Sequence, residues 1–600
     1  MKPLAPTKRP PHPPETARFT WNLPQILRIV ALALFASVCW CYVTGRTDEA
    51  TWSIPLEYGM MGADGDAGEA LSRIKAASEG EYLPALVKNI TRVGAPYYGN
   101  WSDYPVVEEW QFFLPGMLAK WIGVFAAANV AVMMAQVLAC LCFYFTARLL
   151  DCKWWWAMAG GVAFGFAQFA LARSIHHLTV TNYWYVPICI LIAGWVARNQ
   201  LGESRGGRYA WVLGASFFIG MQNPYYTNMF LQLTLLGAFY QYFRNGWKPV
   251  MQAGGIVAAS AAGFIVMSLD TLIYHLQHGS NPGAIVREYR WLELSALKFV
   301  DLLIPPPDHS LLGGIGQAYY KMVAFPGEVG PSCYLGLAGI AALVWLAVVS
   351  VRRLVTTPGR NLPLETWQLL WILAYSTVGG LNCLGGVFGV TVFRSSTRYC
   401  IFILPIVLLF ALRRLSQKRL DTETGVTLAG VCALLALWDQ TPPVPAPALT
   451  EAMARVVDSD RQFTAQMEAR LPKRAMVFQV PIMEFPETPS TIPAYDHFRP
   501  YLHSTDLRFS FGGVKGRPWH EWQKDVGKSQ SLGEVIHSVE SYGFAAIYVN
   551  GAGFQDKGAG IKSGFKQLGY SEMIESKRGD LFCVLIHPSI TPTLPAGPVK

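Results

Sequence analysis

Two aspartates, Asp64 and Asp66, lie one residue apart in a glycine-rich stretch that follows the first apolar run of the chain. Glycines let a backbone approach a ligand closely, and carboxylates at positions i and i+2 of an irregular turn can converge on one group. Such a pair can present one carboxylate as a base that takes a proton from a hydroxyl group. It can also hold Mg²⁺ or Mn²⁺, which prefer oxygen ligands. A solvated acidic turn is the competing interpretation.

A second acidic group, with Asp103 and Glu108, follows in residues 97–110, where acids and amides are interleaved with Tyr and Trp. Flat aromatic faces next to hydrogen-bonding edges suit the binding of a carbohydrate. An aromatic belt at a membrane interface, with a solvated edge, is the alternative. We therefore expect Asp103 and Glu108 to contact substrate.

Two further groups belong to short connections between apolar segments. His176 and His177 precede one such segment, and Tyr225 follows a Gln-Asn-Pro break at residues 222–224. Both connections are expected to border the same opening as the acidic residues. A satisfied interfacial histidine is the alternative interpretation for His176 and His177.

Arginines are not expected at the outer end of an apolar segment, since basic residues concentrate on the cytoplasmic side of membrane proteins, so their presence there suggests a function. Arg394 and Arg398 are such residues. Guanidinium groups bind phosphate in a bidentate manner, and the phosphate of a lipid would lie at this depth. Snorkelling of the two side chains to lipid headgroups is the alternative. Lys515 and Arg517 form a similar cluster in the polar tail of the chain.

The composition indicates a membrane protein. Of 600 residues, 52% are hydrophobic and only 15% are charged, which is too apolar for a soluble enzyme of this length. The 20 Trp residues fit aromatic belts at two membrane interfaces. The 11 Cys residues form no CxxC pair or Cys/His cluster, so zinc and redox chemistry have no support.

Eleven transmembrane helices are predicted from the apolar runs, most of them close to the length of about 20 residues that a span needs. They follow a disordered basic tail at residues 1–28. The predicted spans are 29–43, 128–147, 154–172, 181–197, 209–222, 225–243, 250–272, 333–351, 366–381, 397–412 and 422–438.

Loop charges set the expected orientation. With eleven spans, the segments on the side of the N-terminus hold 19 Lys and Arg but only three acids, whereas the loop 45–124 holds six basic and eleven acidic residues. The positive-inside rule then places the N-terminus in the cytoplasm and the C-terminus outside. This distribution also accounts for the net charge of +9 without a nucleic-acid partner.

The predicted architecture is therefore a polytopic α-helical membrane domain, residues 29–439, with outer loops 45–124 and 273–331. Residues 440–600 lose the long apolar runs. There, short strands at 476–480, 545–549 and 581–586 alternate with helical patterns at 531–542 and 561–568. We expect a soluble extracytoplasmic α/β domain.

With these features assembled, the chain resembles the GT-C superfamily of integral-membrane glycosyltransferases, and in particular the bacterial proteins grouped as YfhO-like membrane proteins. The resemblance covers most of the chain and depends chiefly on architecture. The local phrases that carry it are Gly65-Asp66-Ala67, Gly94-Ala95-Pro96, Asp103-Tyr104-Pro105, Trp291-Leu292-Glu293, the prolines before His309, the segment from Arg394 to Arg398, and residues 512–517.

The resemblance implies an inverting glycosyltransferase of the bacterial inner membrane that uses a polyprenyl-phosphate sugar as donor. A cell-envelope glycan or lipid would accept the sugar at the outer face. By analogy, Asp66 or Asp64 is the catalytic base and Arg394 or Arg398 holds the donor phosphate. Glu293 and His309 are substrate-binding candidates on the same basis. The WWD-type signature of oligosaccharyltransferases is missing, so transfer to asparagine is not expected.

Two other classes of function remain open. A transporter or flippase for a lipid-linked envelope precursor would favour inverted repeats, broken helices and charges within spans. The sequence has no visible repeat, and the acid Asp270 lies near the end of a span rather than at its centre. The other class is a non-catalytic scaffold in envelope assembly.

Overall fold

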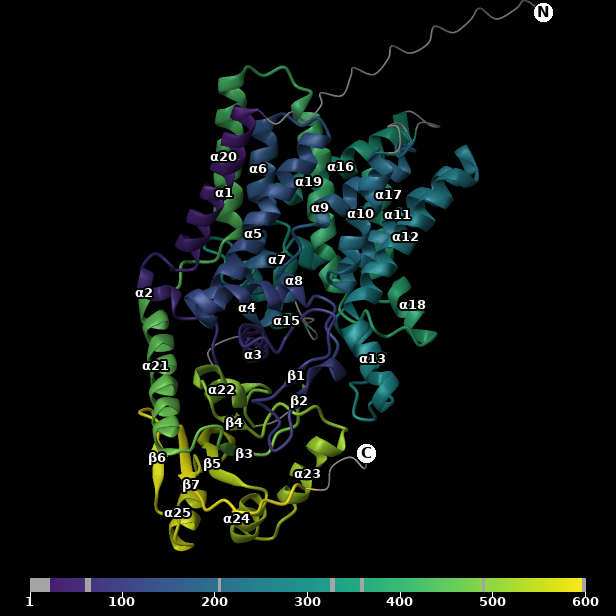
Figure 1. Cartoon of the computed structure of the whole chain (residues 1–600). Coiled ribbons are helices and arrows are strands. Elements are labelled where there is room, and N and C mark those ends of the chain that lie inside the picture. Colours follow the sequence, from purple (N-terminus) through teal and green to yellow (C-terminus); the bar gives the residue numbers. More distant parts are fainter. Residues whose placement is uncertain are drawn as a thin grey trace, which may run out of the picture.

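The computed structural model describes residues 22–59, 66–202, 207–323, 330–356, 361–487 and 491–595. Long helices fill one part of the molecule, and a small sheet with its own helices fills the other (Figure 1). This agrees with the predicted fold class, a polytopic helical membrane domain followed by a C-terminal α/β unit. Residues 1–21 of the predicted basic tail lie outside the described residues.

Each of the eleven predicted spans coincides with a helix or a pair of consecutive helices. These are α1 (Leu23–Val43), α5 (Val124–Leu149), α6 (Trp154–Gly165) with α7 (Gln168–Leu171), α8 (Leu178–Thr181) with α9 (Val186–Ala197), α10 (Gly207–Gly220), α11 (Pro224–Asn245), α12 (Trp247–Met267) with α13 (Leu269–His278), α16 (Gly336–Thr356), α17 (Leu364–Ser376) with α18 (Leu381–Val387), α19 (Cys400–Ser416) and α20 (Thr422–Gln440).

Six helical stretches in the described ranges are both long and apolar enough to cross a membrane: Leu23–Val43, Val124–Leu149, Ile175–Ala197, Trp247–Met267, Gly336–Thr356 and Ser396–Ser416. Of the other predicted spans, α6, α10 and α17 are too brief, with 12, 14 and 13 residues, whereas α11 and α20, with 22 and 19 residues, are long enough but less apolar. The helix α1 begins at Leu23 rather than at the predicted residue 29, because Asn22 caps it by accepting a hydrogen bond from the backbone N–H of Gln25 at 3.0 Å.

The helix α19 forms the centre of the membrane bundle. Its residues Cys400 to Leu412 are all buried, as expected of a helix that is apolar on every side. It packs against α16, α17, α9 and α6. Since η5 (Ser396–Tyr399) leads directly into α19, the central helix fixes the position of the preceding arginine segment.

The first outer loop contains structure that its sequence pattern did not predict. It includes α2 (Glu49–Trp52), α3 (Ala67–Ser78) and α4 (Trp110–Ile122), with a hairpin of β1 (Asn89–Ile90) and β2 (Gly99–Asn100). Helices α3 and α4 pack together. The outer face of α4 leaves Leu114 60% and Trp121 86% exposed, which fits a helix lying at a membrane interface.

Short elements complete the outer side of the bundle. They are η1 (Trp101–Asp103), η2 (Ile175–His177), α14 (Arg290–Leu294), η3 (Phe299–Leu302), α15 (Gly313–Met322) and η4 (Gly330–Cys333).

The C-terminal unit is built on a five-stranded sheet of order β4-β3-β5-β7-β6. The strands are β3 (Met476–Val480), β4 (Arg508–Phe509), β5 (Phe544–Asn550), β6 (Met573–Glu575) and β7 (Leu581–Leu585). The first three strands in this order are parallel, and β7 is antiparallel to both of its neighbours. The helical elements are α21 (Pro447–Arg470), η6 (Asp496–Phe498), α22 (Arg499–His503), α23 (Pro518–Gly527), α24 (Leu532–Ser541), η7 (Gly551–Gly553) and α25 (Ala559–Gln567).

The first outer loop extends this sheet, although the two segments are far apart in sequence. The backbone N–H of Phe509 donates to the carbonyl of Arg92, and that of Ala95 donates to the carbonyl of Phe509, both at 2.9 Å. The N–H of Gly94 donates to the carbonyl of Phe511, also at 2.9 Å. The loop and the C-terminal unit are thus one packed body at one end of the bundle, called the outer body below after the expected position of its loop.

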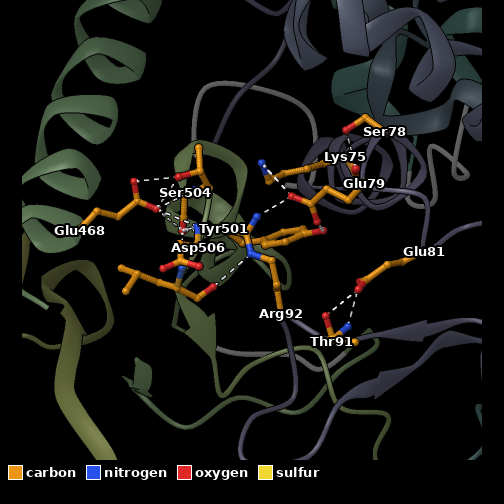
Figure 2. A network of polar contacts seen from close by, with 12 residues as sticks. Lys75, Ser78, Glu79, Glu81, Thr91, Arg92, Glu468, Tyr501, Ser504 and Asp506 are labelled. Atoms are coloured by element: carbon orange, nitrogen blue, oxygen red, sulfur yellow. Dashed lines mark hydrogen bonds and ion pairs between the residues drawn. The ribbon is translucent and has the colours of Figure 1, made fainter. Parts of the chain in front are cut away.

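Side chains reinforce this joint, as Figure 2 shows. Arg92 forms an ion pair with Glu79 of α3 and donates to the hydroxyl of Ser504 at 2.9 Å. The hydroxyl of Tyr501 donates to Glu79 at 3.0 Å. Glu468 of α21 accepts hydrogen bonds from Ser504 and from the two residues that follow it.

A buried arginine forms a second joint between the loop and the C-terminal unit. Arg499 donates two hydrogen bonds of 2.7 Å to Asp460 of α21 and also pairs with Asp496 and Asp580. Tyr58 of the first outer loop donates to Asp460 at 2.8 Å. Removing one partner of a buried pair leaves an uncompensated charge, which costs about 3–5 kcal/mol.

We therefore expect Arg499→Met to lower the apparent melting temperature of the purified protein in detergent strongly, since three carboxylates lose their cation. Tryptophan fluorescence during heating measures this. The matched control is Arg461→Met on α21, because its ion pair with Asp458 is 65% and 52% exposed and surface pairs contribute little. Equal melting temperatures for the two variants would contradict the structural role of Arg499.

Candidate functional site

A cavity of about 600 Å³ opens where the membrane bundle meets the outer body. Five parts of the chain line it: the first outer loop, the turn after α7, the start of α11, the segment after α13, and the residues before α19; the C-terminal unit closes one side. The polar lining residues are Asp66, Glu69, Asp103, Tyr104, Glu108, His176, His177, Thr179, Tyr225, His275, Asn281, Arg287, Arg394, Arg398 and Glu487.

Most of the predicted site residues meet in this one cavity. The members of the predicted set that line it are Asp66, Asp103, Glu108, His176, His177, Tyr225, Arg394 and Arg398. Glu293 and His309 do not line it, and Asp64 lies outside the described residues. The segments involved are separated by hundreds of residues, so their convergence is a property of the fold.

The acidic wall of the cavity begins at α3. Asp66 immediately precedes the helix, and its carbonyl accepts the backbone N–H groups of Glu69 and Ala70. Glu69 also lines the cavity and accepts a hydrogen bond of 2.7 Å from Arg73. Burial raises the pKa of Glu69, and the adjacent Arg73 opposes this effect. The start of α3 therefore presents two carboxylates to the cavity, and the helix N-terminus favours their charge.

Glu108 is a third carboxylate on this wall, at the entrance to α4. Only 6% of the residue is exposed, and burial raises its pKa to about 7. The neighbouring Glu109 points elsewhere: it forms an ion pair with Lys88, which also contacts Asp270 at 2.8 Å. Lys88, held by Glu109, thus ties the first outer loop to Asp270 of α13, whereas Glu108 faces the cavity.

Asp103 lines the cavity, but its oxygens are occupied. Its side chain is unexposed and accepts hydrogen bonds from Arg517 at 2.7 and 3.0 Å and from Asn281 at 2.7 Å. His275 lies 2.9 Å from the same carboxylate. Asp103, a predicted substrate contact, and Arg517, part of the phosphate-capable cluster in the polar tail, pair with each other in the structure and join three segments.

Arginines form the opposite, cationic wall. The guanidinium of Arg398 lies 4.6 Å from the centre of the Tyr225 ring, and that of Arg394 lies 5.9 Å from the ring of Trp291. The hydroxyl of Tyr225 donates to the carbonyl of Val392 at 3.2 Å. Such stacking orients the planar donors of a guanidinium without neutralising its charge. This wall can hold an anion of the size of a phosphate.

His176 belongs to a carboxylate–imidazole pair. Its Nδ1 lies 2.8 Å from both carboxylate oxygens of Glu57, and its backbone N–H donates to Glu57 at 3.1 Å. The ring of His177 lies 4.5 Å from that of His176. Glu57 carries no recognisable local motif and was not predicted.

Other polar residues of the cavity were not predicted from the sequence, and Arg287 and Glu487 are two of them. Arg287 forms a bidentate ion pair with Glu487 at 3.0 and 3.1 Å, and the hydroxyl of Tyr104 reaches Glu487 at 3.4 Å. This contact connects the segment after α13 to the C-terminal unit across the cavity. His275 was also missed. In the sequence, the only indication that these residues belong to the site is their position in segments expected to lie on the outer side.

Two predicted substrate contacts lie elsewhere. Glu293 accepts a hydrogen bond from the hydroxyl of Tyr289 at 3.1 Å. His309 is buried: its Nε2 lies 3.2 Å from Asp439, and its Nδ1 accepts the backbone N–H groups of Leu311 and Leu312. His309 therefore holds the proline-rich segment against the end of α20.

The metal hypothesis concerned Asp64 and Asp66, of which the structure describes only Asp66. Within the described ranges, no group of three or more His, Cys, Asp or Glu side chains is arranged to hold a metal ion.

The raised pKa of Glu108 makes stability depend on pH. The carboxyl keeps its proton in the folded protein up to about pH 7, whereas its ordinary value is 4.5, so folding stability falls as the pH rises through this window. We expect Glu108→Gln to be more stable than the wild type at pH 8, by up to about 3 kcal/mol, and equally stable at pH 4.5. Melting curves at both pH values test this; an equal difference at the two values would contradict it.

No protein-family model and no curated protein matches the chain. Among solved structures, it is similar to ArnT from Cupriavidus metallidurans in the apo state, with 14% identity, 94% of this chain and 98% of that chain covered, and a TM-score of 0.39. For the structure of ArnT bound to undecaprenyl phosphate, the identity is 12%, 95% of this chain and 99% of that chain are covered, and the TM-score is 0.38. It is also similar to the arabinofuranosyltransferase AftD from Mycobacteria, with 12% identity, 87% of this chain and 36% of that chain covered, and a TM-score of 0.43.

Proposed function

We propose that this protein is a GT-C-type membrane glycosyltransferase. It moves a sugar from a polyprenyl-phosphate donor to a cell-envelope glycan or lipid at the outer face of the membrane. The observation that supports this most is the cavity at the junction of bundle and outer body, where the carboxylates of Asp66, Glu69 and Glu108 share one space with Arg394 and Arg398. The family resemblance of the sequence points in the same direction.

The two walls suit the two halves of a sugar transfer. The acceptor hydroxyl loses its proton to a carboxylate, which we assign to Asp66, while its oxygen forms a bond to the anomeric carbon. The bond between that carbon and the phosphate oxygen breaks, and its electron pair stays on the phosphate. The phosphate gains one negative charge in this step. Arg394 and Arg398 would stabilise that charge as it develops.

A second, mostly apolar cavity of about 630 Å³ supports a lipid-linked substrate. Helices α4, α5 and α10 line it with residues such as Leu114, Met134 and Phe218. It lies on the other face of α4, since Trp110 and Gln111 line this cavity whereas Glu108 and Phe112 line the polar one. An isoprenoid chain in the apolar cavity would bring its phosphate close to the polar one.

The proposed orientation has a cytoplasmic N-terminus and a periplasmic C-terminal unit in the bacterial inner membrane. In Figure 1, α1 begins at the end of the bundle opposite to the C-terminal sheet. The charge difference between inner and outer loops supports this orientation.

A divalent cation is a secondary proposal. Asp66 supplies a carboxylate of the type that Mg²⁺ and Mn²⁺ accept, and such an ion would add positive charge near the donor phosphate. Loss of transfer in EDTA, with recovery on adding Mg²⁺ or Mn²⁺, would support it.

Asp66→Asn tests the assignment of the base. Purified protein in nanodiscs is given a panel of radiolabelled polyprenyl-phosphate sugars, and donor consumption is followed for both proteins. We expect the wild type to consume one donor and the variant to lose activity by about 10²–10⁴-fold, the usual contribution of general base catalysis.

The matched control is Glu293→Gln, an outer-side carboxylate away from the cavity, which should retain activity. Full activity of Asp66→Asn would overturn the assignment of the base. A folded wild-type protein that consumes no donor would overturn the glycosyltransferase and favour a transporter or a scaffold.

Arg398→Gln tests the phosphate-binding wall. We expect kcat/KM for the donor to fall by about 10–100-fold, because charge-assisted hydrogen bonds contribute about 1.5–3 kcal/mol. Arg290→Gln is the control, since the Arg290 side chain is 67% exposed and pairs with Glu288. Equal kinetics for the two variants would contradict a role of Arg398 in donor binding.

A further inference from the structure

The turn that carries His176 lies between the two walls of the cavity. On one side, η2 packs against α3, at whose start Asp66 is located. On the other side, the hydroxyl of Tyr226 donates to the carbonyl of Val180 at 2.7 Å, and the adjacent Tyr225 stacks with Arg398. His176 is therefore placed between the proposed base and the proposed phosphate-binding arginines.

The orientation of the His176 ring is fixed by Glu57. An ionised carboxylate only accepts hydrogen bonds, so the Nδ1 atom next to it must carry a hydrogen. A second hydrogen bond, from the backbone N–H of His176 to the same carboxylate, holds Glu57 in place. The neutral imidazole then has its lone pair on Nε2, the nitrogen turned away from Glu57. The pair is largely enclosed, with side-chain exposures of 6% for His176 and 14% for Glu57.

Several charged and titratable groups share the cavity with this imidazole. The anionic ones favour its protonated form, and the cationic ones disfavour it. The groups that share the cavity with it are Asp66 and Glu69 at the start of α3, Asp103, Glu108 before α4, His177 of the same turn, His275 of α13, Arg287 after α13, Arg394 and Arg398 before α19, and Glu487 of the C-terminal unit. Glu57 is the carboxylate in direct contact.

We propose that His176, positioned by Glu57, carries the proton of the acceptor hydroxyl across the cavity to the departing phosphate. This deepens the proposed function and rests on it. The proton passes from the acceptor oxygen to Asp66, then to Nε2 of His176, and finally to an oxygen of the lipid phosphate. The transfer consumes one hydroxyl proton and leaves one phosphate monoester, so the proton count balances without a further reactant.

The acid–base chemistry of the imidazole and of the phosphate that finally takes the proton favours such a relay. A phosphate monoester has a second pKa of about 6, close to the unperturbed pKa of an imidazole, so a proton can move between them in either direction. Glu57 is a positioning residue: it touches no substrate, but it sets the tautomer of His176 and stabilises the charge that the ring acquires in mid-transfer.

Glu57→Gln separates this role from a merely structural one, because glutamine keeps the shape and an oxygen that can accept the Nδ1 hydrogen, but not the charge. We expect the acidic limb of the kcat–pH profile to move to lower pH by about one unit, since the charged imidazole loses its nearest anion. His176→Gln should lower kcat about 10–100-fold while changing the donor KM little. Glu49→Gln and His537→Gln, at exposed positions, are the controls.

A readout independent of activity accompanies the kinetics. Modification of His176 by diethyl pyrocarbonate is followed by mass spectrometry across a pH series, and the pH of half-maximal modification should fall in Glu57→Gln. An unshifted modification curve, or an unshifted kcat–pH profile in an active Glu57→Gln, would overturn the relay alone. Full activity of His176→Gln would do the same. A wild type that consumes no donor would overturn the glycosyltransferase and the relay together.

Discussion

A carboxylate removed from water has to be paired, and this constraint holds the outer side of the molecule together. Asp103 has no exposed side-chain surface and accepts from Arg517, Asn281 and His275. These partners come from the C-terminal unit, from the segment after α13 and from α13 itself. Because an unpaired buried charge is so costly, the three segments can assemble only together, and the cavity beside Asp103 exists only when they have done so.

The membrane helices could be predicted because apolar runs are a local property, and each predicted run coincides with one helix or a pair of consecutive helices. The predicted strands at 476–480, 545–549 and 581–586 correspond to β3, β5 and β7 within one or two residues. Helices α3 and α21 were missed because each lies in a polar or mixed segment and is stabilised by its partners, and α4 because its mostly apolar run of 13 residues is too short to indicate a span. The joint between the first outer loop and β4 involves residues more than 400 positions apart, and no local pattern reports such a pairing.

The candidate site could be predicted as a set of residue types but not as a set of roles. An acid, a histidine or an arginine in an outer segment is a reasonable candidate ligand, and most such residues do line one cavity. The role of each of these residues depends on the group that its side chain contacts in the folded protein. Asp103 and His309 are saturated by protein groups, whereas Glu108 faces the cavity with its pKa raised to about 7. Glu57 is identified only by its contact with His176.

The backbone stretch of the first outer loop that pairs with β4 has a further consequence. A sheet edge with unpaired N–H and C=O groups is a template for pairing with other chains. Residues 92–95 cover the β4 edge with three backbone hydrogen bonds. The C-terminal unit, cut free at residue 440, would present this edge uncovered and would tend to aggregate. Protection against self-association is thus built into the connection between the first and last parts of the chain.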